Sequence, residues 1–253
     1  MRFRIRFAAA LVPLLVVATA CGGSEDEKDD TKASGAGSTA DATPGASGGG
    51  SASSGDIAAG TKGYKLVVPE SVDAYTKSSS GTTPDEKEGE GLGVSNARAV
   101  SGVYNAPGTD PGSPGKIGGT RLTFEGFHGE IADPAKALDQ YLADVGNKGL
   151  KGTGKPPGME IQPVASARTV EPAGFEGALM KCQDMQVTLN KGEAAPKGVA
   201  DFRFPVCAWA DYSTLGGANV VVLADMTIGG NGVSQGEVAA LTAKLYNTAR
   251  QKA

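Results

Sequence analysis

Histidine is nearly absent from this 253-residue chain, which contains His128 and no other. A single histidine excludes metal centres built from several imidazoles and leaves one candidate base for a Ser-His-Asp triad. The chain also lacks the Gly-x-Ser-x-Gly segment that would supply the nucleophile of such a triad. Because a lone histidine at the end of a predicted strand is more often a polar surface residue than a catalytic one, we interpret His128 as a surface residue.

Cysteine is scarce as well: the chain has three, Cys21, Cys182 and Cys207. No Cys-x-x-Cys pair occurs, which argues against redox catalysis. No second cysteine or histidine lies at ligand spacing beside Cys182 or Cys207, which argues against metal binding by their thiols. We therefore expect neither a metal site nor a cofactor.

Two segments imitate nucleotide-binding motifs. Residues 149–155 carry the glycines and the lysine of a P-loop, but Pro156 stands where a Ser or Thr hydroxyl would bind magnesium. Residues 220–225 form an apolar run that ends in an aspartate, as any short buried strand followed by aspartate would. Four carboxylates lie in or near predicted strands without the spacing that indicates a glycosidase: Glu125, Glu130, Asp211 and Asp225. We expect no enzymatic activity.

Residues 1–20 have the order of a secretory signal peptide. Three arginines within the first six residues precede an apolar run over residues 7–17, and three small residues follow before Cys21. The apolar run is shorter than the ~20 residues that span a bilayer, and Pro13 interrupts it. We therefore expect residues 1–20 to be removed on export.

The small residues that end in Ala20-Cys21 resemble the bacterial lipobox, in which the cysteine thiol is joined to diacylglycerol. This resemblance implies that Cys21 becomes the lipid-modified first residue and holds the protein on the extracytoplasmic face of the cell membrane. Each CH₂ of an acyl chain such as palmitate contributes roughly 0.8 kcal/mol of membrane affinity, so two or more chains give a durable anchor. The alternative is a secreted protein with a cysteine near its cleavage site.

Residues 21–62 are predicted to be a disordered linker. They are mostly Gly, Ser, Ala, Thr and Asp, and cannot bury enough apolar surface to offset their ordering entropy. As a coil of about 40 residues, the linker has an end-to-end distance on the order of 35 Å. Loss of the three signal arginines changes the net charge from −4 to −7, and no basic patch remains that would indicate a nucleic-acid partner.

Residues 63–253 are long enough for one domain with a hydrophobic core. One helix is predicted to begin at the N-cap Asp133 and to end at Gly146, and a second begins with the capping box of Ser234 and Glu237. Strand candidates occupy residues 64–68, 94–104, 120–131, 161–170, 175–189, 199–212 and 219–228. Runs of strands with two helices interposed indicate an α+β fold with a mainly antiparallel sheet.

Two local patterns give narrower predictions. Residues 78–91 are rich in Ser, Thr, Pro, Asp and Glu, which predicts a mobile loop. In residues 120–131, Leu122 and Phe124 alternate with Thr123 and Glu125, a period typical of a half-buried strand. One face of that strand is therefore expected to be core.

A hairpin is predicted for residues 175–189 and 199–212, around the turn-rich residues 190–198. With the loop centred between Ala194 and Ala195, Cys182 lies opposite Cys207. The same register gives one apolar face with two further pairs, Val187 with Phe202 and Met185 with Phe204. Export favours oxidation, so the pattern predicts a cross-strand disulfide, which closes a loop of about 25 residues and stabilises by roughly 3 to 4 kcal/mol. The alternative is a pair of reduced or metal-binding thiols.

Residues 207–215 contain the only tryptophan. Alternation places Trp209 and Asp211 on one face of the strand and Tyr212 on the other. In one interpretation, Trp209, Asp211 and Tyr212 form a face for a ligand or partner. In the interpretation that we favour, Trp209 packs beside the disulfide, and Asp211 and Ser213 shape the turn into the next strand.

Residues 207–215, together with residues 179–182 and the C-terminal helix, resemble a group of actinobacterial lipoproteins and membrane proteins. Members of that group share a Cys-x-Trp-Ala-Asp-x-Ser-Thr segment followed by a strand and a helix. The resemblance covers residues 64–253 and implies a cell-envelope setting, but no activity. On architecture alone, the chain is also similar to lipoproteins with a PsbP-like or Mog1-like fold.

The predicted function is that of a membrane-anchored binding or interaction module, whose partner is an envelope protein or a small molecule. The alternatives are an envelope hydrolase that uses carboxylates and an accessory subunit of a membrane complex. The face around Trp209 distinguishes the three. A deep pocket with two carboxylates within about 10 Å favours hydrolysis, a shallow apolar cleft favours binding, and a helix that fills the face favours the subunit.

Overall fold

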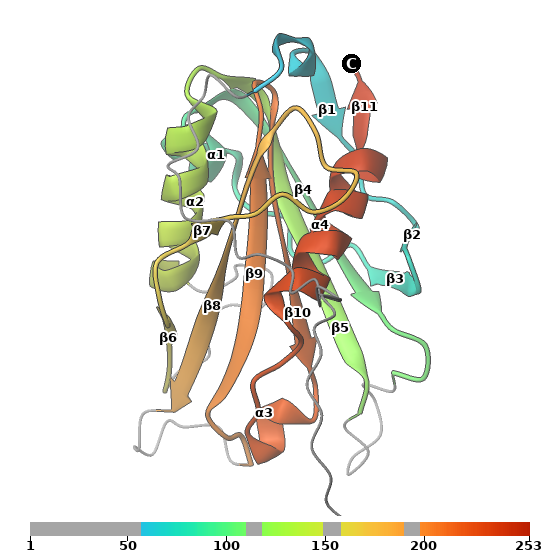
Figure 1. Cartoon of the computed structure of the whole chain (residues 1–253), viewed down its shortest axis with the longest axis vertical. Helices are drawn as coiled ribbons and strands as arrows, with labels where there is room; N and C mark the ends of the chain where they lie inside the picture. The colour runs from blue at the N-terminus through green and yellow to red at the C-terminus, as the bar shows by residue number, and fades with distance from the viewer. Residues whose placement is uncertain (1–56, 110–117, 149–157, 190–197) are drawn as a thin grey trace, which may run out of the picture. The chain divides into compact units, whose positions relative to one another are not determined.

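The computed structural model describes residues 57–109, 118–148, 158–189 and 198–253 (Figure 1). The predicted signal peptide, Cys21 and most of the predicted linker lie outside these residues, as does the P-loop-like segment 149–155. The described residues form an α+β fold around a mainly antiparallel sheet, as predicted.

Nine strands form the main sheet, and each of its ladders between described strands is antiparallel. Their spatial order is β2 (Ser71–Val72), β3 (Tyr75–Ser79), β4 (Val94–Asn105), β5 (Thr120–Ile131), β10 (Thr214–Val222), β9 (Phe202–Ala210), β8 (Leu179–Leu189) and β6 (Met159–Pro163). β7 (Arg168–Thr169) also pairs with β8. A separate two-stranded sheet joins β1 (Tyr64–Leu66) to β11 (Arg250–Lys252).

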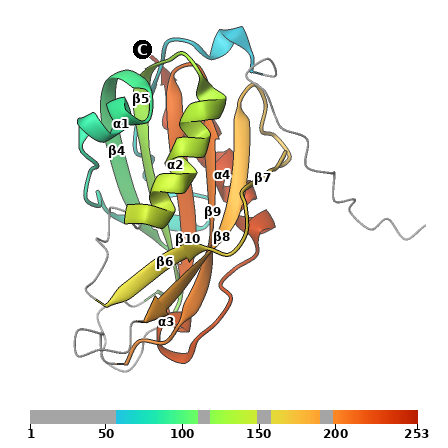
Figure 2. The same cartoon turned by 90° about the vertical axis from the view of Figure 1, so that its left-hand side faces the viewer.

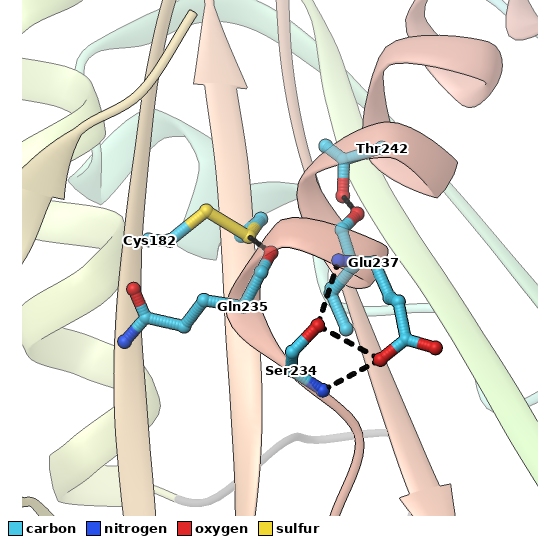
Figure 3. Close-up of a disulfide and its surroundings, with 7 residues drawn as sticks. Cys182, Ser234, Gln235, Glu237 and Thr242 are labelled. Carbon is cyan, nitrogen blue, oxygen red and sulfur yellow. Dashed lines mark hydrogen bonds between the residues drawn. A yellow bond between two sulfur atoms is a disulfide. The ribbon is translucent and has the colours of Figure 1, made fainter. Parts of the chain in front are cut away.

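Two long helices lie on opposite faces of the main sheet, α2 (Pro134–Lys148) and α4 (Gln235–Ala249) (Figures 1 and 2). α2 begins as predicted, because Asp133 Oδ1 accepts a hydrogen bond from the Lys136 N–H at 3.1 Å. The predicted capping box of α4 is also confirmed: Ser234 Oγ accepts from the Glu237 N–H at 3.3 Å, and Glu237 Oε2 accepts from the Ser234 N–H at 2.9 Å (Figure 3).

The sheet separates two hydrophobic layers, so the prediction that one face of β5 is core is incomplete. Leu122 and Phe124 belong to the layer under α4, whereas Phe127 belongs to the layer under α2. Thr123 and Glu125 are also buried, at 4% and 6% exposure. A strand at the centre of a sheet that is covered on both sides is buried on both of its faces, whatever the polarity of alternate residues.

The hairpin register and the disulfide are confirmed. β8 and β9 pair with Cys182 opposite Cys207, and with the predicted pairs of Val187 with Phe202 and of Met185 with Phe204. The two sulfur atoms are bonded, and the two Cα atoms lie 4.1 Å apart. Such a short Cα distance is typical of a directly opposed, non-hydrogen-bonded pair in an antiparallel ladder.

Other boundaries differ from the predictions. The predicted loop 78–91 contains the end of β3 and the short helix α1 (Glu86–Gly91), which Asp85 caps by accepting from the Lys87 N–H at 3.0 Å. The predicted strand 219–228 ends at Val222 and is followed by the one-turn helix α3 (Asp225–Ile228). Residues 57–62, assigned to the linker, pack on the domain and include a 3₁₀ turn, Ala59–Thr61.

Candidate functional site

Trp209 is part of the core and lines no open surface. Its side chain is fully buried, with the Phe124 ring stacked 5.8 Å away and the Tyr246 ring of α4 edge-on at 5.9 Å. Its indole N–H donates to Thr214 Oγ1 at 3.1 Å. On the adjacent strand, Gly216 lies opposite Trp209, and a Cβ there would overlap the indole ring. The face around Trp209 is therefore filled by α4, as the favoured packing interpretation predicts.

The disulfide lies under the first turn of the same helix (Figure 3). Cys182 and Cys207 are both fully buried, and Cys207 Sγ lies 3.8 Å from the carbonyl oxygen of Gln235. The covalent link thus fixes the two strands on which the N-terminus of α4 rests. Burial on this scale is typical of a structural disulfide and not of an exchange-active one.

Asp211 shapes the turn between β9 and β10, as predicted. Its Oδ1 accepts hydrogen bonds from the backbone N–H groups of Ser213 and Thr214, both at 2.8 Å. Its Oδ2 accepts from the Thr214 hydroxyl at 2.7 Å and lies 3.0 Å from Arg250 Nε. Burial raises the pKa of Asp211 above its ordinary value, while Arg250 and the hydrogen bonds act in the opposite direction. The carboxylate is thus engaged on all sides by its own chain.

Arg250 connects the β9–β10 turn to β1, the first strand of the domain, and to α4, its last helix. Its guanidinium lies 4.1 Å from the centre of the Tyr64 ring of β1 and 4.1 Å from that of the Tyr246 ring of α4. Only 10% of the Arg250 side chain is exposed, and Asp211 is not exposed at all. The two cation–π contacts and the buried ion pair together hold the Arg250 side chain in one position.

The residues before β1 are hydrogen-bonded to the same turn. The Ser213 hydroxyl donates to the carbonyl oxygen of Thr61 and accepts from the Tyr64 N–H at 3.2 Å. The Tyr212 N–H donates to Thr61 Oγ1 at 3.4 Å. These hydrogen bonds therefore hold residues 61–64 against the β9–β10 turn, although the two segments are far apart in the sequence.

A cavity of about 790 Å³ lies beside this junction, and we call it the His128 pocket. Its polar and aromatic lining includes Tyr64, His128 and Tyr212. The remaining lining residues are Lys62, Gly63, Lys65, Ser95, Gly129, Glu130, Ile131, Ala132, Ser213 and Ala253. The volume lies within the range of about 300 to 1,000 Å³ that is typical of small-molecule sites.

An irregularity in β4 shapes the rim of the His128 pocket. The register between β4 and β5 shifts between Ser95 and Arg98, and Asn96 between them has a positive φ of 54°. Gly129 faces this bulge, and a Cβ on it would overlap the Ser95 carbonyl oxygen. β-Bulges and left-handed non-glycine residues are enriched beside functional sites, where they re-aim side chains. The bulge therefore supports the choice of the His128 pocket as the candidate site.

The electrostatics of the pocket are dominated by cations near aromatic rings. Lys62 Nζ lies 5.4 Å from the centre of the Tyr212 ring, and Lys252 Nζ lies 4.5 Å from that of Tyr64. Burial lowers the pKa of His128 below its ordinary value, and the charges of Arg98 and Lys65 lower it further. These effects favour the neutral imidazole, and its buried Nδ1 has no hydrogen-bond partner among the described residues.

The predicted face of Trp209, Asp211 and Tyr212 is thus divided by the structure. Of the three, Tyr212 alone lines the pocket. Trp209 packs in the layer under α4, and Asp211 is buried in the β9–β10 turn beside Arg250. His128, interpreted from the sequence as a polar surface residue, is half-buried in the pocket wall. The clearest sequence signal for the pocket is the pair of lysines around Tyr64, a segment that we had assigned partly to the linker.

The candidate carboxylates do not form an acid–base pair in the His128 pocket. Asp211 precedes β10 and Asp225 follows it, which places them about 30 Å apart at 3.3 Å per strand residue. Glu125 is buried under α2, where its Oε1 accepts from the Tyr141 hydroxyl at 3.1 Å. Among the described lining residues, Glu130 is the one with a carboxylate side chain. These positions give no support to a glycosidase-like arrangement.

The part of the chain that the structure describes contains neither a metal centre nor a membrane-spanning helix. Within the described residues, no group of three His, Cys, Asp or Glu side chains is placed to bind a metal ion. None of the described helices combines the length and the hydropathy that crossing a membrane requires. The chain matches no family model, no curated protein and no solved structure. The similarity to actinobacterial lipoproteins and to PsbP-like or Mog1-like folds stays a prediction.

Proposed function

We propose that the protein is a cell-envelope lipoprotein whose domain is a binding module without catalytic activity. The observation that carries this proposal is the His128 pocket, which combines a ligand-sized cavity of about 790 Å³ with aromatic and cationic lining groups. The pocket wall is assembled from β1, β5 and the β9–β10 turn and is fixed by the buried ion pair of Asp211 and Arg250. A rigid wall of this kind lowers the entropic cost of binding.

The anchor in this proposal is Cys21, and the setting is the extracytoplasmic face of the cell membrane. Its support is the order of residues 1–21, with a basic start, a short apolar run and small residues before the cysteine. The disulfide of the domain agrees with export, because disulfides persist in oxidising compartments.

Replacing Cys21 is expected to abolish lipid attachment. In cells fed an alkyne-tagged fatty acid, the wild-type protein should be labelled and membrane-bound, whereas Cys21→Ala should be unlabelled and released. A suitable control is Ser24→Ala, which changes a nearby residue without a thiol and should be labelled like the wild type. Equal labelling of Cys21→Ala would contradict the lipid anchor.

Binding is tested by native mass spectrometry of the released Cys21→Ala protein, isolated from the producing organism without denaturation. A small adduct that is lost when Tyr212→Ala is introduced would place a ligand in the His128 pocket. A spectrum with the bare chain mass at several growth conditions would contradict small-molecule binding.

A second candidate, an accessory subunit of a membrane complex, is favoured by the filling of the Trp209 face by α4. That packing removes the sheet face that a ligand-binding interpretation of Trp209 needs. The same spectrum distinguishes the two candidates, because a subunit would be found with a protein partner of fixed stoichiometry.

A further inference from the structure

The His128 pocket has cationic groups on several sides. Lys62 and Lys65 line it, and Arg98 lies close enough to lower the pKa of His128 from the neighbouring strand β4. Lys252 of β11 contacts the Tyr64 ring from beside the cavity. These four cations come from three separate segments of the chain: residues 62–65, β4 and β11.

The opposing side-chain charges near the pocket are fewer than the cations. Glu130 lines the pocket with an exposed side chain, and Glu86 of α1 forms an ion pair with Arg98 at 2.9 Å, in which both side chains are more than half exposed. Ala253 also lines the pocket, and its backbone N–H donates to the Gly63 carbonyl oxygen at 2.9 Å. Glu86 therefore offsets part of the charge of Arg98, whereas Lys62 and Lys65 supply the positive charge of the lining itself.

The body of the cavity is apolar. Tyr64, Tyr212, Ile131 and Ala132 are the aromatic and aliphatic residues of its lining that carry this character. Lys62 lies over one face of the Tyr212 ring. Positive charge set beside apolar wall is complementary to a molecule that joins an anionic group to a compact apolar body.

We propose that the His128 pocket binds a small organic anion, with Lys62 and Lys65 supplying the opposite charge and Tyr64, Tyr212 and Ile131 contacting an apolar body. The anionic group is a carboxylate or a phosphate or sulfate ester. This inference rests on the proposed binding function and narrows it to one ligand class. His128 contributes its single N–H when neutral, and an anion bound beside it favours its protonated form.

The test uses the NMR signals of His128, which are unambiguous because the chain has no other histidine. The full-length Cys21→Ala protein is titrated with benzoate, with benzylammonium as the cationic analogue and with benzyl alcohol as the neutral one. Benzoate is expected to shift the His128 signals saturably and to raise the pKa of His128, whereas the two analogues leave it unchanged. Binding of benzoate should be tighter at pH 5.5 than at pH 8.

Charge variants make the result specific to the pocket. The double variant Lys62→Gln/Lys65→Gln is expected to weaken benzoate binding about tenfold, since each exposed charge pair contributes up to about 1 kcal/mol. Lys87→Gln/Lys136→Gln removes the same charge from lysines outside the pocket lining and should bind benzoate like the parent.

Two results would overturn the inference in different ways. Equal binding of benzoate, benzylammonium and benzyl alcohol would show a binding pocket without preference for anions, which leaves the proposed binding function intact. No saturable change of the His128 signals with benzoate at either pH would exclude an anion in this pocket. The proposed function would then depend on the adduct measured by native mass spectrometry.

Discussion

Asp211→Ala is expected to lower the free energy of unfolding by about 3 to 5 kcal/mol, because it breaks a buried ion pair and leaves the other charge without its partner. The substitution also removes the acceptor of the Ser213 and Thr214 backbone N–H groups and of the Thr214 hydroxyl. Arg250, with a 10% exposed side chain, would keep only its contacts with two tyrosine rings. Urea unfolding of the Cys21→Ala protein, followed by tryptophan fluorescence, measures the loss.

Two variants identify the source of that loss. Asp211→Asn keeps an acceptor oxygen for the turn but removes the charge, and should therefore cost less than Asp211→Ala. Asp139→Ala breaks the ion pair of Asp139 with Lys181, whose atoms lie 2.5 Å apart but whose carboxylate side chain is 59% exposed. That variant should cost less than about 1 kcal/mol. Similar losses for Asp211→Ala and Asp139→Ala would show that the buried pair is not a stabilising element.

The elements that could be predicted are those whose signal is local. Asp133 and the Ser234–Glu237 pair predict helix starts because a capping side chain bonds to backbone groups within three residues of itself. The β8–β9 register could be predicted because one loop centre fixes every pair in a hairpin, Cys182 with Cys207 included. α1 has a capping residue, Asp85, but no apolar stripe: its six residues, Glu86–Gly91, are charged residues and glycines, so the cap alone does not distinguish a helix from a loop.

Burial on both faces of β5 could not be predicted, because alternation shows which residues share a face and not what covers that face. Glu125 illustrates the difference. Its polarity suggested solvent, but the Tyr141 hydroxyl of α2 donates to its carboxylate, and Gly217 on the neighbouring strand leaves room for the Tyr141 ring. Such a contact depends on three elements that meet only in the folded chain.

The candidate site could be predicted only in part for the same reason. Tyr212 was singled out because it follows the conspicuous Trp209, yet the two residues face opposite layers of the sheet. His128 is brought beside Lys65 by the packing of β1 across the end of β5, a contact between residues more than sixty positions apart. No local pattern in the sequence marks a pocket whose lining comes from five separate stretches of the chain.

Trp209→Ala is expected to cost about 3 to 5 kcal/mol of unfolding free energy, the usual loss when a large aromatic side chain is removed from a core. The indole fills the space between Phe124, Tyr246 and Gly216, and its removal would leave a cavity there. Trp209→Phe keeps a ring in the stack but loses the hydrogen bond to Thr214, so its cost should be about 1 to 3 kcal/mol. Circular dichroism during thermal and urea unfolding measures both variants, since the substitutions remove the fluorophore.

Tyr212→Ala is the matched comparison, because it removes an aromatic ring from the next segment of the chain but from the opposite, partly exposed face. It should cost less than half the stability that Trp209→Ala costs, while it removes part of the wall of the His128 pocket. Trp209→Phe, in contrast, should leave benzoate binding unchanged. If Trp209→Phe weakened benzoate binding while Tyr212→Ala did not, the ligand would lie on the α4 side of the sheet. The assignment of Trp209 to the core and of Tyr212 to the pocket wall would then be wrong.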